Sequence, residues 1–266
     1  MTHLHSPWTG MVPVDDTALF TNDTGGPGTP VVYLNGAYAD LRHWDSVVAD
    51  LGTADWRHVR FDERARGRSR RSVDYSFEAC LRDIEVVLDA ADVERPVLAG
   101  WSYGATLAVH WARRHPDRTL GVVAVDGAMP YDWIDDEARA RLRRLFHRMR
   151  WILPVASRMG LAARMSAAQH AEVNIEVNEL LGTLESVLDS IEAPVRYVVA
   201  TGGHLGTDDA EMAKVRATLE PVLDRRPNIR VSATVPTNHA RILRREFDAV
   251  ADAVREVGRP AGPGDG

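Results

Sequence analysis

One short stretch of the chain, residues 100–104 with the sequence GWSYG, combines residue types suited to nucleophilic catalysis. It lies between an apolar run, 97–99, and a segment with helical periodicity, 105–114. A strand that turns directly into a helix needs a tight corner, and glycines two residues to either side let the two elements approach without Cβ clashes. The corner presents the hydroxyl of Ser102 where the first free N–H groups of the helix would stabilise an oxyanion. The pattern therefore predicts a nucleophilic serine.

Alternating apolar runs and amphipathic segments surround this motif. The runs that predict strands are 12–23 (two strands turning at Asp15-Asp16), 30–34, 57–61, 97–99, 120–125, 195–200 and 229–235. The amphipathic segments predict helices over 41–51, 77–90, 105–114, 208–224 and 240–257. This alternation indicates an α/β protein with a mostly parallel sheet and helices on both faces.

The alternation stops between residues 130 and 191, where only helical patterns occur. We interpret 130–191 as a helical cap inserted between two strands of one core, which comprises 1–129 and 192–266. Apolar cap residues, among them Trp133, Phe146 and Trp151, are candidates to cover a pocket above Ser102. The alternative is that they only pack the cap onto the core.

The same segment carries a cluster of arginines from Arg139 to Arg150, which would suit a nucleic-acid or membrane surface. Apolar residues interrupt the cluster at helical spacing, and the acidic residues 135–137 precede it. We therefore interpret it as a solvated helix face. An arginine turned inward to meet an anionic substrate stays open.

Composition narrows the classes of function. The net charge is −6 with no long run of either sign, so nothing global suggests nucleic acid. The single cysteine, Cys80, excludes an internal disulfide and a cysteine-based metal cluster, and we expect it on a helix as a small apolar residue. No signal peptide is recognisable and no apolar stretch approaches 18 residues. We expect a cytoplasmic protein, monomeric or homodimeric, that binds a small-molecule substrate and neither nucleic acid nor membrane.

With these features together, the chain resembles the α/β-hydrolase superfamily over about residues 10–258, apart from the cap. The motifs that carry the resemblance are residues 100–104, Asn35-Gly36 after an early strand, Asp62 with Gly67 and Ser69 after the next strand, and His239 in the sequence TNHA. The resemblance implies the α/β-hydrolase fold, with an eight-stranded, mostly parallel sheet and a helical cap after the sixth strand.

Ser102 needs a base to take its proton, because a serine hydroxyl is otherwise a poor nucleophile. His239 is the best candidate among ten histidines, since it follows the strand 229–235 and precedes the last helix, at the same sheet edge as Ser102. The alternative is an ordinary loop histidine.

The acid that orients this histidine has two candidate positions. Most of the superfamily places it after the seventh strand in a Gly-x-x-Asp pattern, which this chain lacks after 195–200. Asp208, five residues beyond Gly203, is better suited to cap the next helix. Asp126 ends the sixth strand, where some haloalkane dehalogenases and the zearalenone-type lactonases place the acid, and this chain resembles them in that respect. We prefer Asp126 and keep Asp208 as the alternative.

The resemblance also implies an oxyanion hole made by the backbone N–H groups of Tyr103 and Ala37. Asn35 stands where many relatives have histidine, but the N–H donor does not depend on that side chain. Tyr38 is expected to face the substrate, and Trp101 to line the pocket or pack beneath it. Asp62 is expected to be structural.

The sequence therefore predicts a serine hydrolase acting on a small or medium, mostly apolar ester or lactone, without a metal or organic cofactor. Dehalogenation is disfavoured because the resembling dehalogenases carry an aspartate at the position of Ser102. Three alternatives stay open: a hydrolase of C–C bonds, a cofactor-free oxidative or cyclising enzyme of secondary metabolism, and a non-catalytic ligand-binding protein with the same fold.

Overall fold

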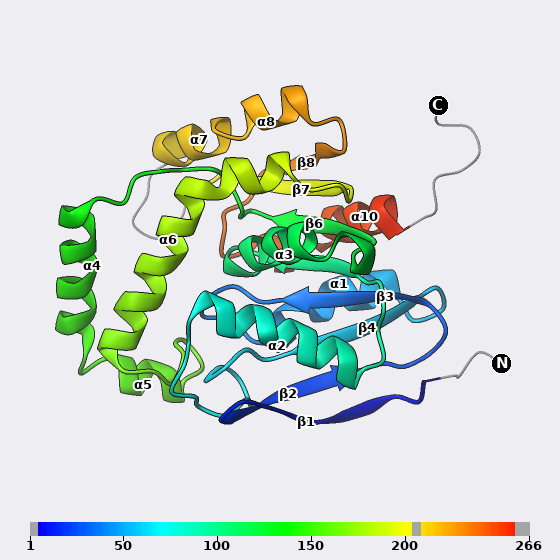
Figure 1. Cartoon of the computed structure of the whole chain (residues 1–266), viewed down its shortest axis with the longest axis horizontal. Helices are drawn as coiled ribbons and strands as arrows, with labels where there is room; N and C mark the ends of the chain where they lie inside the picture. The colour runs from blue at the N-terminus through cyan, green and yellow to red at the C-terminus, as the bar shows by residue number, and fades with distance from the viewer. Residues whose placement is uncertain (1–4, 204–208, 259–266) are drawn as a thin grey trace.

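The computed structural model describes residues 5–203 and 209–258 (Figure 1). This part of the chain contains an eight-stranded sheet with the strand order β1-β2-β4-β3-β5-β6-β7-β8. β2 runs antiparallel to β1 and β4, and the other neighbours are parallel. The strands are β1 (Trp8–Val14), β2 (Thr17–Asp23), β3 (Thr29–Leu34), β4 (Trp56–Phe61), β5 (Val97–Trp101), β6 (Gly121–Val125), β7 (Val195–Ala200) and β8 (Ile229–Val235). The predicted α/β fold with a mostly parallel sheet is confirmed.

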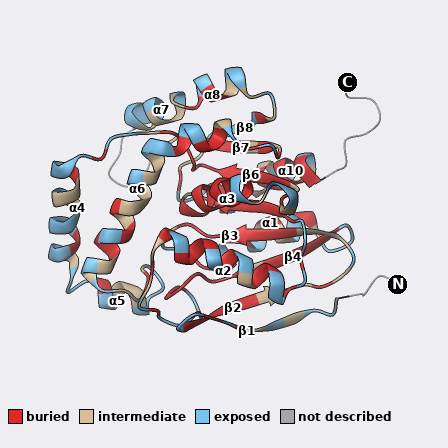
Figure 2. Ribbon diagram, viewed as in Figure 1, coloured by how far each residue is buried: buried red, intermediate tan, exposed pale blue. Residues whose placement is uncertain are grey.

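Helices cover both faces of this sheet (Figure 1). One apolar cluster joins the strands to α2 (Phe77–Ala90), α3 (Tyr103–Arg114) and the end of α6 (Ala167–Asp189). A second cluster joins the opposite face to α1 (Asp45–Leu51), α9 (Ile242–Arg245) and α10 (Phe247–Gly258). The short 3-10 helices η1 (Leu41–Trp44) and η2 (Pro116–Arg118) lie before α1 and after α3. The central strands are therefore buried on both sides, as Figure 2 shows.

Two predicted helices are interrupted. The segment expected as 208–224 forms α7 (Asp209–Ala217) and α8 (Glu220–Arg225), with Pro221 in the first turn of α8. Proline has no N–H to donate and its ring clashes with a preceding helical turn, so it begins a new helix. The segment expected as 240–257 divides at Glu246, whose backbone angles leave the helical region.

The insertion between β6 and β7 is helical throughout its regular structure, with α4 (Asp136–Met149), α5 (Leu153–Arg158) and α6. The last turns of α6 belong to the main core through Leu184, Val187 and Leu188. α4 packs along the first half of α6, through small clusters of their own apolar residues. As a result, α4 and α5 lie at the edge of the molecule, away from the sheet (Figure 1). No helix in the described part of the chain has the length and apolar character needed to cross a bilayer.

The loop after β4 is fixed by buried polar contacts. The carboxylate of Asp62 accepts hydrogen bonds from the N–H groups of Leu41 and Arg68, at 2.8 Å and 2.7 Å. Gly67 has a φ of 44° and passes so close to the Asp62 carboxylate that a Cβ there would overlap it. Asp62 is therefore structural in this fold. The loop that it holds carries Glu63 and Arg66, which lie beneath the candidate site.

Cys80 lies on the buried face of α2, among the apolar residues of the main core. Burial raises the pKa of its thiol to about 12. A thiol with so high a pKa is almost entirely protonated at neutral pH, and the thiolate is the reactive form. Cys80 thus behaves as a small apolar residue, as the sequence indicated.

Candidate functional site

Ser102 is the single residue between β5 and α3, and its φ of 55° lies in the left-handed region. A Cβ on Gly100 would overlap the carbonyl oxygen of Gly104, and a Cβ on Gly104 would overlap that of Leu34. The two glycines are therefore required by close backbone contacts, as the sequence pattern predicted. The corner places the start of α3 directly against the end of β3.

His239 and Asp126 are joined by a hydrogen bond of 2.9 Å between Nδ1 and Oδ2. Both side chains are buried. A carboxylate can only accept a hydrogen bond, so Nδ1 of His239 is the nitrogen that carries the ring proton. In this tautomer Nε2 has the free lone pair and is the basic nitrogen of the ring. The other carboxylate oxygen, Oδ1, accepts from the backbone N–H of Ala200 at 3.1 Å. The carboxylate is thus oriented by two strands, β6 and β7.

The end of β6 lies directly against Ser102. The backbone N–H of Ser102 donates to the carbonyl oxygen of Val125 at 3.0 Å, and Val125 precedes Asp126. A Cβ on Gly127 would lie 2.5 Å from the carbonyl oxygen of Ser102. The structure therefore brings Ser102, Asp126 and His239 to one edge of the sheet.

Trp101 connects this edge to the loop after β3. Its ring lies 5.4 Å from the His239 ring and 5.7 Å from the His43 ring, measured between centroids. A Cβ on Gly36 would approach the Trp101 ring to 3.0 Å. Trp101 thus packs against His239 and the loop after β3, and its place beside or beneath a substrate pocket stays a prediction.

The loop after β3, which carries Ala37, one of the two predicted oxyanion donors, is held on its carbonyl side. The carbonyl of Gly36 accepts from the N–H of Ala39 at 3.0 Å, so the N–H of Ala37, on the far side of the same trans peptide, points the opposite way. The carbonyl of Ala37 accepts from Nε of the buried Arg66 at 2.6 Å. Tyr103 begins α3, where helix geometry leaves its N–H without an intrahelical acceptor.

Glu63 supports the same loop from below. Its carboxylate accepts hydrogen bonds from the backbone N–H of Asn35 at 2.7 Å and from the Asn35 side-chain amide at 2.9 Å. The Asn35 oxygen in turn accepts from the Trp44 indole at 3.0 Å. Burial raises the pKa of Glu63 to about 7, although the nearby Arg66 and the Asn35 hydrogen bonds act in the opposite direction. Asn35 therefore holds the loop through a buried carboxyl group.

A cavity of about 490 Å³ lies between this loop and the insertion. Tyr38 and Arg66 line it from the core, and Met159 and Ala162 line it from the segment after α5. The Tyr38 hydroxyl accepts a hydrogen bond of 3.0 Å from the Asn174 side chain of α6. Tyr38 is thus in contact with both the core and the insertion.

The other predicted pocket residues lie elsewhere. Phe146 is buried inside the insertion and stacks on His170 at 5.6 Å. Trp133 donates a hydrogen bond to Asn178 at 2.9 Å. Trp151 is 76% exposed, so its ring faces solvent. Asp208, the alternative acid, lies outside the described residues.

Sequence reasoning did not identify Arg216 of α7, which lies beside the buried carboxylate. Its Nε is 3.6 Å from Oδ1 of Asp126, and its two terminal nitrogens donate to the carbonyl oxygens of Thr201 and Gly202. An isolated arginine on a helix gives no sequence signal for such a contact. Glu63 and Arg66, in the loop after β4, were missed because their contacts with Asn35 and Ala37 join residues distant in sequence. Among the described residues, no group of three or more acidic, histidine or cysteine side chains is arranged to hold a metal ion.

Comparison with known proteins decides the family. Residues 29–159 match the family model described as alpha/beta hydrolase fold. The chain is 31% identical over 215 residues to the rhodomycin D methylesterase DauP of a Streptomyces species, covering 76% of this chain and 71% of that protein. The chain belongs to the α/β-hydrolase fold family.

Other relatives agree with this assignment. The hydrolase is 26% identical over 147 residues to a haloalkane dehalogenase of Mesorhizobium japonicum, and this alignment covers 54% of the chain but only 47% of the dehalogenase. In fold it is similar to a thermophilic esterase from Thermogutta terrifontis, with a TM-score of 0.71, 20% identity, and 96% and 100% of the two chains covered. It is also similar to an enol-lactonase from Burkholderia xenovorans, with a TM-score of 0.68, 21% identity, and 93% and 99% covered.

The close packing at the Ser102 corner predicts that adding a methyl group at Gly104 destabilises the fold. Gly104→Ala should lower the free energy of unfolding of the hydrolase by about 2 kcal/mol or more, because the new methyl group displaces α3 from the end of β3. Gly10→Ala is the control, since a Cβ there meets only the Trp8 ring at 3.6 Å. Urea unfolding monitored by circular dichroism measures both variants. Equal stability of the two would contradict the close approach of β3 and α3.

The raised pKa of Glu63 predicts a pH dependence of stability. Between pH 4.5 and about 7 the folded protein keeps a proton on Glu63 that the unfolded chain releases, so the free energy of unfolding should fall as pH rises. Glu63→Gln cannot release this proton. The stability of wild type relative to this variant should therefore decrease by up to about 3 kcal/mol across that range.

Urea unfolding at pH 4.5 and 7 tests this expectation. Glu94→Gln, at an exposed position, is the matched control and should show no such trend. A pH-independent difference between wild type and Glu63→Gln would show that the carboxyl group is ionised in the folded protein.

Proposed function

We propose that this α/β hydrolase cleaves a small or medium, mostly apolar carboxylic ester or lactone through an acyl-enzyme on Ser102. The observation that carries the proposal is the 2.9 Å hydrogen bond between His239 and Asp126, at the sheet edge where the Ser102 N–H is bonded to Val125. A serine nucleophile needs a base in one fixed tautomer. A buried carboxylate hydrogen-bonded to the imidazole holds the histidine in that tautomer.

The reaction has two halves. In the first, Nε2 of His239 takes the Ser102 proton while Oγ attacks the substrate carbonyl, and the Asp126 carboxylate stabilises the imidazolium that forms. The N–H groups of Ala37 and Tyr103 stabilise the tetrahedral oxyanion. The imidazolium then protonates the departing alkoxide, which leaves an acyl-serine. In the second half His239 takes a proton from water, the hydroxide attacks the acyl carbon, and the proton returns to Ser102.

Two considerations favour an ester as the substrate and disfavour a haloalkane. The methylesterase relative is aligned over 71% of its length, and its name specifies ester cleavage. Dehalogenation would alkylate Ser102 to an ether, which an imidazole-activated water does not cleave. A carboxylate nucleophile instead forms an ester, which water can hydrolyse.

We assign residues 130–191 as the cap of this site. Several hydrogen bonds tie its long helix α6 to the core. Near the Tyr38 loop, Asn174 donates to the Tyr38 hydroxyl, and Glu176 accepts from the N–H of Phe77 at 2.9 Å. The cavity between the Tyr38 loop and the segment after α5 is lined by Tyr38 and Ala39, which follow Ala37, and it is not lined by Ser102 or His239. Phe146 and Trp151 belong to the packing and the surface of the cap.

Asp126→Asn should lower kcat for an aryl ester or lactone on the order of 10³-fold, because an amide supports the wrong tautomer and cannot stabilise the imidazolium. Asp208→Asn should change kcat only modestly. A large loss in Asp208→Asn with a small one in Asp126→Asn would identify the later carboxylate as the acid. Labelling of wild type but not Ser102→Ala by a fluorophosphonate separates an enzyme from a ligand-binding protein of the same fold.

Arg216 is a positioning residue in this scheme, because it lies beside the acid without a role at the carbonyl. Its positive charge opposes the field of Asp126 at His239, so Arg216→Gln should favour the imidazolium. The acidic limb of the kcat/KM profile should then move to higher pH, with rates at high pH retained within a few fold. Lys214→Gln, an exposed position on the same helix, makes the same charge change and should leave the limb in place. A uniform loss at every pH in Arg216→Gln would indicate a structural role alone.

A further inference from the structure

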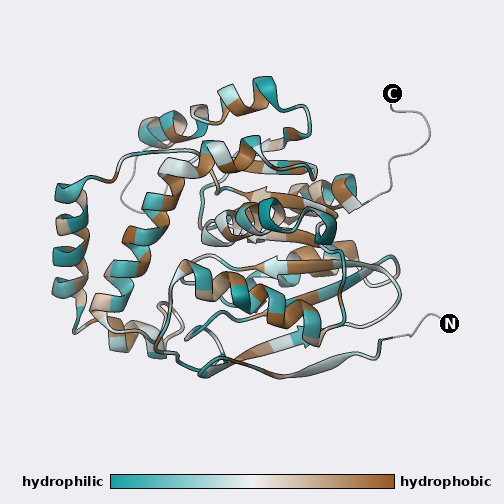
Figure 3. Ribbon diagram, in the orientation of Figure 1, coloured by the Kyte–Doolittle hydropathy of each residue, from teal (hydrophilic) through white to brown (hydrophobic). Residues whose placement is uncertain are grey.

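The outer end of the cap exposes an unusual number of large apolar side chains. We call this surface the tip patch; its apolar members are Trp151, Ile152, Val155, Met159 and Leu161, and its basic members are Arg144, Arg148 and Arg158. The five apolar side chains are between 56% and 76% exposed, within eleven consecutive residues. Figures 2 and 3 show this end of the cap, around α5, as a region where hydrophobic segments reach the surface.

The local structure explains why these residues face outward. Leu153 is the buried residue of α5 and attaches it to Phe146 and Ala171. Ile152, Val155 and Met159 follow at the spacing of one helical face and lie on the side away from this contact. Folding therefore uses one side of this short helix and leaves the other apolar side uncovered.

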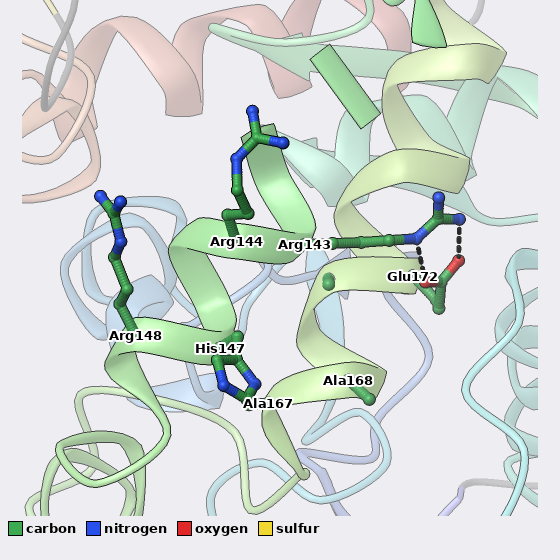
Figure 4. Close-up of a pocket in the computed structure, with 8 residues that line it drawn as sticks. Arg143, Arg144, His147, Arg148, Ala167, Ala168 and Glu172 are labelled. Carbon is green, nitrogen blue, oxygen red and sulfur yellow. Dashed lines mark hydrogen bonds and ion pairs between the residues drawn. The ribbon is translucent and has the colours of Figure 1, made fainter. Parts of the chain in front are cut away.

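The tip patch is also the basic pole of an acidic protein. Residues 138–171 contain eight arginines and no aspartate or glutamate, whereas the whole chain has a net charge of −6. Arg143 is neutralised by Glu172 of α6 at 2.8 Å, but Arg144 and Arg148 extend away from this pair (Figure 4). Arg144, Arg148 and Arg158 have no acidic partner among the residues that the structure describes.

In contrast to the expectation from the sequence that the chain binds no membrane, we propose that the tip patch docks the hydrolase onto the surface of an anionic phospholipid bilayer. Apolar side chains that stand out from a basic surface match the two layers of such an interface: the arginines pair with headgroup phosphates, and the apolar groups enter the acyl boundary. The acidic remainder of the protein is repelled by the same surface, so the charge distribution orients the molecule with the cap toward the bilayer.

The charge and shape of the patch favour a bilayer over two other possible occupants, a second copy of this chain and an acidic protein. A symmetric dimer through this patch would bring the unpaired arginines of both copies into one interface without acidic partners, which is unfavourable. An acidic protein would match the arginines, but it would need a preformed concavity to cover apolar groups that protrude this far. A fluid bilayer covers protruding groups without one. The patch adjoins the cavity beside Tyr38, which Met159 and Arg158 also line, so docking would face this cavity toward the membrane.

Co-sedimentation with vesicles tests the proposal and does not depend on ester hydrolysis, so it can fail or succeed separately from the proposed function. The full chain should sediment with vesicles of equal parts phosphatidylcholine and phosphatidylglycerol, and much less with phosphatidylcholine alone. Binding should weaken as salt increases, because the attraction between the arginines and the headgroups is screened.

Matched variants locate the surface. Arg144→Gln with Arg148→Gln should weaken vesicle binding about tenfold or more. Arg113→Gln with Arg230→Gln makes the same charge change at exposed positions elsewhere and should have little effect. Trp151→Ser with Val155→Ser should also weaken binding, whereas Val73→Ser, at a position 84% exposed, should not. Circular dichroism confirms that each variant is folded.

Several results would overturn the proposal. These are no binding to the anionic vesicles, equal losses in the matched controls, and a wild-type dimer that Trp151→Ser with Val155→Ser makes monomeric. Binding to polyglutamate without binding to vesicles would assign the patch to an acidic protein instead.

Discussion

The backbone reverses from β5 into α3 at one residue, Ser102, and the position of every other group at the site depends on this corner. Left-handed backbone angles there are maintained by contacts on both sides: Gly104 lies against the end of β3, and the Ser102 N–H is bonded to β6. The half-buried Ser102 therefore lies where the loop after β3 and the turn after β6 meet. Without these contacts at the corner, the start of α3, the loop after β3 and the turn after β6 would not be held in fixed positions relative to one another.

Asp126, the acid that we propose, directly follows β6, so its position depends on the sheet itself. Asp126 has a φ of 42° and directs its carboxylate toward both His239 and the N–H of Ala200, so its orientation is fixed by the pairing of β6 with β7. Arg216 adds a cation at 3.6 Å from the same carboxylate. The Asp126 side chain thus lies within reach of an imidazole, a backbone N–H and a guanidinium, and its own burial strengthens such polar interactions.

Local patterns in the sequence predicted the strands, the parallel sheet and the corner, because period and glycine spacing are set by nearby backbone geometry. The choice of Asp126 as the partner of His239 came from the resemblance to those α/β hydrolases that place the acid at the end of the sixth strand, and not from periodicity or strand order. The roles of Glu63, Arg66 and Arg216 could not be predicted, because each depends on a contact with a residue distant in sequence. Trp151 was expected over the pocket, yet periodicity does not show which side of a short helix the core uses. The prediction of one helix over 208–224 was wrong, although Pro221 is a local signal for the break between α7 and α8.

Burial of Cys80 has a practical consequence for studying residues 130–191, the segment that we propose as the cap. The native thiol is protonated and inaccessible in the core, so the wild-type chain is in effect free of reactive sulfur. A cysteine introduced on the surface, for example on α4, would react alone with a spin label or a fluorophore. Distances between the cap and the sheet can then be followed in solution without first removing a native cysteine.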